Sequence, residues 1–259
     1  MKNGRGVWMA LWLSAVMSGC VVQEFPNERK ADTGAGARDR VAIASEWLQK
    51  GDNERALVHL RKALELDPKS PEAHNLMGVL LDRDGDRKGA DRHFRRAIAL
   101  RPSYPQAHNN YGGFLFREKR YRDAAQQFEM AASEISYELR AQAFEGLGRS
   151  ALELRDRERA ERAFMRALRL NADLPISNLE MADLRYQQDD LAGARNFYQR
   201  YLRLTANVPQ TARSLWLGIR IERRLGDQNA LASYELALKR LYPNSEEYKA
   251  WAASQAGGK

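Results

Sequence analysis

A pattern of 34 to 36 residues recurs six times along this chain of 259 residues. The six blocks begin at Ala37, Pro71, Pro105, Ala141, Pro175 and Thr211. Alanine stands at the twentieth place of every block, and an aromatic residue stands at the twenty-fourth place of every block except the first. Self-similarity at such a period is typical of solenoids, in which each short unit packs against its neighbours. The chain is therefore predicted to form a stack of repeated units.

The small residues in the pattern predict that each block folds as two packed helices. Glycine or alanine at the eighth place and alanine at the twentieth let two helix backbones approach closely, and the aromatic ring fills the space between neighbouring pairs. The eighth places hold Ala44, Gly78, Gly112, Gly148, Ala182 and Gly218, and the twentieth hold Ala56, Ala90, Ala124, Ala160, Ala194 and Ala230. Seven of the eight prolines lie at or near block junctions, where the first turn of a helix tolerates them.

This pattern resembles the tetratricopeptide repeat. The resemblance implies an all-α fold, a right-handed superhelix of six helix pairs with a C-terminal capping helix. The six repeats are assigned to residues 37–70, 71–104, 105–138, 141–174, 175–208 and 211–244. Residues 245–259 are assigned to the capping helix and tail, because Ser245 followed by two glutamates is a favourable helix start.

The N-terminal segment predicts an export signal. Lys2 and Arg5 precede an apolar stretch from Val7 to Met17, which is too short to span a bilayer. The following Ser-Gly-Cys resembles the lipobox of bacterial lipoproteins, which implies that residues 1–19 are removed and that Cys20 is acylated. Residues 20–36 then form a tether, and Val21 after the cysteine implies the outer membrane. Ordinary secretion is the alternative.

Composition and motifs argue against several classes of function. The formal net charge is +8, but basic and acidic residues are interspersed without a long basic run, which argues against nucleic-acid binding. No hydrolase, metalloprotease or phosphate-binding loop motif is present, so no enzyme activity or cofactor is expected. His74 and His108 share one place of their blocks, and His59 and His93 share another. Repetition explains these four histidines better than metal coordination does.

The concave surface of such a superhelix is the expected binding site, lined by the first helix of each pair. The second, fifth, ninth, twelfth and thirteenth places face this groove in tetratricopeptide-repeat proteins. The candidate contact residues are Val41, Ser45, Leu48, Asn75, Asn109 and Phe116. Their mixed, partly apolar chemistry suits an amphipathic helix or an extended segment and argues against a carboxylate clamp. Burial of Leu48 and Leu179 against neighbouring repeats is an equally open interpretation.

The whole chain resembles the type IV pilus biogenesis lipoproteins, the pilotins, in its lipobox, tether, six repeats and final helix. That resemblance implies a lipid-anchored monomer with its repeats in the periplasm. It would bind the secretin subunit of the pilus and promote its localisation and multimerisation in the outer membrane. Two alternatives remain open: a scaffold for cell-wall or envelope enzymes, and a subunit of a lipid or polysaccharide export machine.

Overall fold

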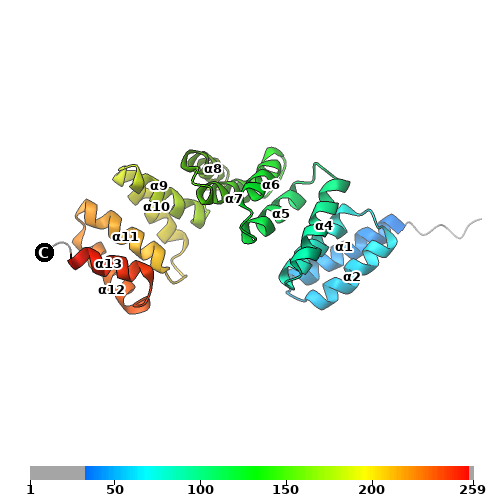
Figure 1. Ribbon diagram of the computed structural model, residues 1–259, viewed down its shortest axis with the longest axis horizontal. Helices are drawn as coiled ribbons and strands as arrows, with labels where there is room; N and C mark the ends of the chain where they lie inside the picture. The colour runs from blue at the N-terminus through cyan, green and yellow to red at the C-terminus, as the bar shows by residue number, and fades with distance from the viewer. Residues whose placement is uncertain (1–32, 257–259) are drawn as a thin grey trace, which may run out of the picture.

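The computed structural model describes residues 33–256, and over that range the chain forms thirteen α-helices and no strand. The all-α prediction is confirmed. The helices follow one another in an arch, with α1 and α13 at its opposite ends (Figure 1). Near the middle of the arch, α5 and α7 lie on its inner side and α6 and α8 on its outer side.

The first twelve helices form six pairs. We call the first member of each pair a first helix and the other a second helix. The pairs are α1 (Thr33–Gln49) with α2 (Asn53–Leu66), α3 (Pro71–Arg83) with α4 (Arg87–Leu100), α5 (Pro105–Arg117) with α6 (Tyr121–Ser133), α7 (Arg140–Glu153) with α8 (Arg157–Leu170), α9 (Pro175–Gln187) with α10 (Leu191–Leu204), and α11 (Ala212–Leu225) with α12 (Gln228–Leu241). The last helix, α13 (Glu246–Ala256), follows the sixth pair.

The turn between the two helices has the same backbone conformation in all six pairs. A residue with positive φ ends the first helix in all six pairs, and it is glycine at positions 51, 85 and 226. The other three pairs place Lys119, Arg155 and Asp189 there, at φ of 59°, 61° and 65°. An aspartate then begins five of the second helices, as Asp156 does by accepting a hydrogen bond from the backbone N–H of Arg159 at 3.0 Å. These two signals together mark the start of every second helix except α6, which follows Arg120 and has only the first signal.

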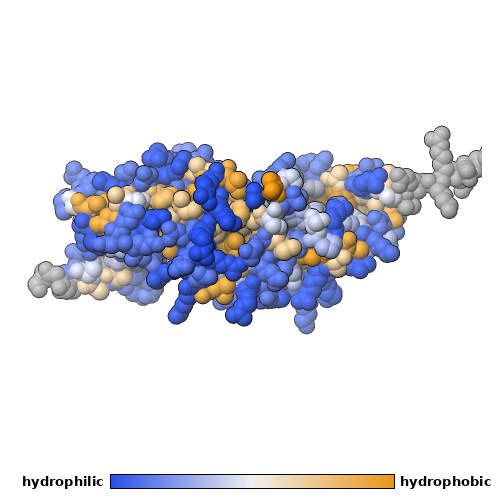
Figure 2. All heavy atoms as spheres, turned by 90° about the horizontal axis from the view of Figure 1, so that it is seen from above, coloured by the Kyte–Doolittle hydropathy of each residue, from blue (hydrophilic) through white to orange (hydrophobic). Residues whose placement is uncertain are grey.

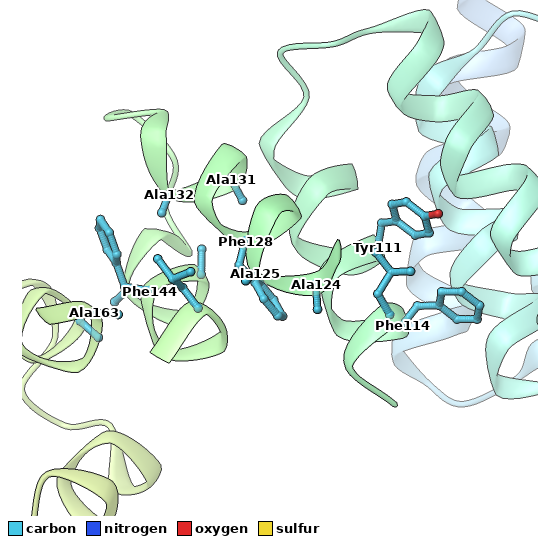
Figure 3. Close-up of a cluster of buried hydrophobic side chains, with 14 of the residues drawn as sticks. Tyr111, Phe114, Ala124, Ala125, Phe128, Ala131, Ala132, Phe144 and Ala163 are labelled. Atoms are coloured by element: carbon cyan, nitrogen blue, oxygen red, sulfur yellow. The ribbon is translucent and has the colours of Figure 1, made fainter. Parts of the chain in front are cut away.

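Small residues and aromatic rings pack against one another in the core. Phe128 lies beside Ala124 and Ala125, with Phe144 across the junction to the next pair (Figure 3). A Cβ added to Gly112 would lie 2.9 Å from the Phe128 ring. The eighth place therefore accepts only a small residue, because the ring from the twenty-fourth place already fills that space.

Two predicted boundaries can be compared with the structure. Helix α1 begins at Thr33, so the tether assigned to residues 20–36 is wrong over its last four residues. The helix extends because this turn packs on the end of α2: a Cβ added to Gly36 would lie 3.5 Å from Leu66. At the other end, Ser245 accepts a hydrogen bond from the backbone N–H of Tyr248 at 3.1 Å and so caps α13.

The signal peptide and Cys20 lie outside the described residues. No helix between residues 33 and 256 is both long and apolar enough to cross a membrane.

Candidate binding groove

Three adjoining hollows lie along the first helices from α3 to α11. The first occupies about 770 Å³ and includes Asn109 and Gln142; the second occupies about 650 Å³ and includes Phe116. The third occupies about 820 Å³ between α7, α9 and α11. Arg149 lines both the first and the second, and Leu152 lines both the second and the third. The hollows thus form one continuous surface, which we call the inner groove.

Ion pairs link two of the steps between consecutive first helices, α3 to α5 and α9 to α11. The pairs are Arg117 with Asp82, Arg213 with Glu180, Arg220 with Asp183 and Arg224 with Asp189. Each pair joins residues 33 to 37 apart, so the repeat period itself brings the partners together. These arginines are already neutralised by the protein, and they are poorly placed to attract a charged ligand.

At the step from α5 to α7, an aromatic ring contacts the arginine in place of a carboxylate. The guanidinium carbon of Arg149 lies 4.6 Å from the centroid of the Phe116 ring, and the Tyr121 ring contacts Phe116 edge-on at 5.3 Å. Within residues 33–256 neither Arg149 nor Arg155 forms an ion pair, although Glu153 lines the same hollow. The middle of the groove therefore offers an aromatic surface beside two cations without a carboxylate partner.

Amide side chains line the neighbouring hollow. Asn110 donates a hydrogen bond from Nδ2 to Oδ1 of the buried Asn75 at 3.1 Å. Asn109 and Gln142 also line this hollow, although the Oε1 atom of Gln142 is itself buried and has no hydrogen-bond partner within the described structure. An amide provides both a donor and an acceptor, so this part of the groove can pair with the backbone of an extended segment.

The six candidate contact residues differ in whether they line the inner groove or are buried between helices. Asn109 and Phe116 line the inner groove, whereas Val41 and Ser45 are half-buried on α1 and line none of the three hollows. Leu48 is only 5% exposed, and it packs among Leu60, Met77 and Leu80. Leu48 and Asn75 are both buried, so neither side chain is exposed to the groove in this structure. Leu48 fills the space between the first two pairs, and the Asn75 amide is used to join α3 to α5.

The fourth block contains the groove residues that the sequence analysis did not single out. Gln142, Arg149, Leu152 and Glu153 occupy its second, ninth, twelfth and thirteenth places. These are the same places that gave the candidates in other blocks. The repeat pattern therefore carried the signal, and the structure shows that these residues line the hollows of the inner groove.

The histidines take part in contacts between the helices of a pair. The Nδ1 atoms of His74 and His93 lie 3.0 Å apart in one hydrogen bond, and Nε2–H of His74 donates to the carbonyl oxygen of Pro68 at 3.2 Å. Burial lowers the pKa of both histidines. His108 makes the equivalent contact with Gln127 at 2.7 Å. Within the described residues, no three metal-ligating side chains are grouped together.

Comparison with known proteins connects this architecture to a family. Residues 46–85 match the family described as TPR repeat, and residues 77–138 and 146–209 match the family described as tetratricopeptide repeat. The type IV pilus assembly protein PilF of Pseudomonas aeruginosa is 39% identical over 245 residues, covering 94% of this chain and 96% of that protein.

Solved structures agree with the sequence match. The Pseudomonas aeruginosa PilF structure is 38% identical with a TM-score of 0.81, covering 86% of this chain and 99% of that one. PilW, described as a widely conserved type IV pilus biogenesis factor, is 25% identical with a TM-score of 0.69, covering 83% and 98% of the two chains.

Proposed function

The chain belongs to the family of type IV pilus assembly proteins that includes PilF, and we propose that it serves pilus biogenesis by binding the secretin subunit of the pilus. In this proposal it is a scaffold without catalytic activity. It guides the subunit to the outer membrane and promotes its multimerisation there. The observation that carries the proposal is the inner groove, at whose centre the exposed Arg149 stacks on the partly exposed ring of Phe116.

The groove supplies three kinds of contact to a bound segment. The amides of Asn109 and Gln142 pair with an extended backbone, and Phe116 and Leu152 take up apolar side chains. Each square ångström of apolar surface removed from water contributes roughly 25 cal/mol to such binding. Arg149 then selects for an acidic group in the segment, since its charge has no carboxylate partner.

Anchoring at the outer membrane is part of the same proposal. The lipobox-like Ser-Gly-Cys ending at Cys20 and the valine that follows it support this location. A lipid anchor would keep the repeats in the periplasm close to the membrane in which the secretin must insert. A single acyl chain holds a protein only marginally, so stable anchoring needs the several chains that the lipoprotein resemblance implies.

The test is complementation of a deletion strain with the wild-type gene or with a groove variant. The groove variant carries Phe116→Ala and Arg149→Gln, and a control carries Arg200→Gln and Arg203→Gln on α10. Membranes are fractionated, and multimeric secretin is quantified on native gels. We expect multimers with the wild type and the control, and a loss of most multimers with the groove variant. Normal multimers in the deletion strain itself would contradict the proposal.

A further inference from the structure

Three arginines surround a separate hollow of about 220 Å³ at the edge of α7 and α8. They are Arg140, Arg166 and Arg169, and the hollow is completed by Phe144 and Leu170. We call this hollow the arginine pocket. None of its residues lines the inner groove, so a ligand bound here would not compete with one bound there.

Two of the guanidinium groups are held in place. Arg140 donates a hydrogen bond from Nε to the carbonyl oxygen of Ala132 at 2.8 Å, and its Cζ lies 5.5 Å from the centroid of the Phe144 ring. The Cζ atom of Arg166 lies 5.7 Å from the same centroid. One buried ring thus holds two cations close together. Because these side chains are already ordered in the free protein, they lose less conformational entropy when a ligand binds.

The positive charge of this pocket is not neutralised. Within the described residues none of the three arginines forms an ion pair, whereas Arg159 and Arg162 of the same helix pair with Glu129 and Glu158. The carboxylate of Glu134, which the charge of Arg140 reaches, accepts hydrogen bonds from Ser136, and these are the main cause that lowers its pKa.

Exposed apolar side chains occur at the pocket and in the segment that precedes Arg140. Leu170 is 51% exposed, Leu139 is 40% exposed and Ile135 is 80% exposed. The last two lie between the end of α6 and the start of α7, near the place where the repeat lengthens from 34 to 36 residues. The outer face around this junction is mainly hydrophilic, with hydrophobic side chains in small groups (Figure 2). Cations beside exposed apolar groups suit an amphiphile with an anionic head.

We propose that the arginine pocket binds a phosphate group, and that the phosphate belongs to a phospholipid headgroup. Guanidinium groups bind phosphate oxygens with paired, charge-assisted hydrogen bonds, and three of them converge on this hollow. The exposed leucines favour a lipid over free phosphate, because they would contact the glycerol and upper acyl region next to the headgroup.

The next repeat provides a matched control. Arg200 and Arg203 occupy the same places of the fifth block as Arg166 and Arg169 do of the fourth, and they are also exposed and outside any ion pair within the described residues. The positions equivalent to Arg140 and Phe144 hold Leu174 and Asn178, so this site lacks both the third guanidinium and the ring. The two double substitutions change the net charge equally.

The experiment is co-sedimentation of the full chain with lipid vesicles. All proteins carry Cys20→Ser so that no acyl chain contributes. One set of vesicles is phosphatidylcholine alone, and the other is an equal mixture with phosphatidylglycerol. Each basic residue near an anionic surface contributes to the free energy of binding. Removing two of them with Arg166→Gln and Arg169→Gln should therefore weaken binding to the anionic vesicles by about 30-fold. Arg200→Gln with Arg203→Gln should weaken it by less than about threefold, and thermal unfolding should show both variants folded.

A second arm uses inorganic phosphate, titrated into the same proteins by calorimetry. Saturable binding that only the Arg166 and Arg169 substitutions abolish, without preference for anionic vesicles, would keep the pocket but assign it to free phosphate. Equal losses in the two double variants would show general attraction by a basic surface and overturn the proposal. Absence of binding in both arms would also overturn it.

Discussion

The guanidinium of Arg213 on α11 donates two hydrogen bonds to the carboxylate of Glu180 on α9, at 2.5 and 2.6 Å. The side chains differ in exposure, at 49% for Arg213 and 11% for Glu180. Removing the arginine would leave a buried carboxylate without its main partner, while removing the glutamate would leave a cation that water can reach. We predict that Arg213→Ala lowers the free energy of unfolding by about 1–3 kcal/mol and that Glu180→Ala lowers it by less than about 1 kcal/mol.

Urea denaturation of the two single variants measures this asymmetry. Equal losses would mean that the pair acts as a surface ion pair, and the buried carboxylate would not be the costly partner.

Two adjacent glycines on α5 should respond in opposite ways to the same substitution. A Cβ on Gly112 would lie 2.9 Å from the Phe128 ring, whereas a Cβ on Gly113 would meet only the end of Arg117 at 3.6 Å. We predict that Gly112→Ala destabilises the protein by about 1–3 kcal/mol through overpacking. Gly113→Ala should stabilise it by about 0.5–1 kcal/mol, because alanine favours a helix more than glycine does. Thermal unfolding of both variants measures these opposite changes in stability. A stabilised Gly112→Ala protein would contradict the packing described for the eighth place.

The His74–His93 contact predicts a loss of stability in weak acid. Burial is the main cause that lowers the pKa of both histidines below the ordinary value of 6.5. The charged groups around the pair are Arg92 and Arg96, which lower these pKa values, and Asp67 and Asp86, which raise them. Since the unfolded state takes up protons first as the pH falls through about 6.5, stability should decline from there toward the lower pKa values of the folded state.

The contact between His108 and Gln127 in the next repeat suggests His93→Gln as the variant that tests the predicted loss of stability in acid. In His93→Gln the remaining imidazole can be protonated and still donate to an amide oxygen, as the 2.7 Å contact of the next repeat allows. The variant should match the wild type at pH 7.5 and lose less stability between pH 7 and 5. Identical pH profiles in chemical denaturation would show that another group controls the acid sensitivity.

The sequence predicted the helix pairs and the fold because the repeat fixes small and aromatic residues at places where helices touch. It could not decide whether Leu48 faces solvent or the core, since an inward place on α1 also borders α3. The chemistry of the groove around Arg149 depends on which arginines form an ion pair with a carboxylate of the neighbouring repeat. The pattern does not show that Arg117 pairs with Asp82 while Arg149 stacks on Phe116. The arginine pocket likewise needs Arg140 and Arg166 to converge on one ring, which only the packing of α7 on α8 reveals.

The proposed lipid anchor makes a prediction that does not depend on the groove. Cys20→Ser should leave the repeats folded, with an unchanged helical circular dichroism spectrum, but should abolish acylation and retention in the membrane fraction. Cell fractionation with a high-salt wash measures the retention. If the variant stayed in the outer membrane fraction after this wash, another feature would hold the protein there.

The most direct measurement of the central claim is the affinity of the purified protein for the purified secretin subunit, determined by biolayer interferometry. Truncation of a central aromatic residue in an interface costs about 2 kcal/mol or more, so Phe116→Ala should weaken binding by about 30-fold. Arg149→Gln should also weaken it and reduce its dependence on salt, while Arg200→Gln with Arg203→Gln on α10 should bind as the wild type does. If the wild type binds the subunit and both groove variants bind it equally well, the inner groove is not the site of recognition.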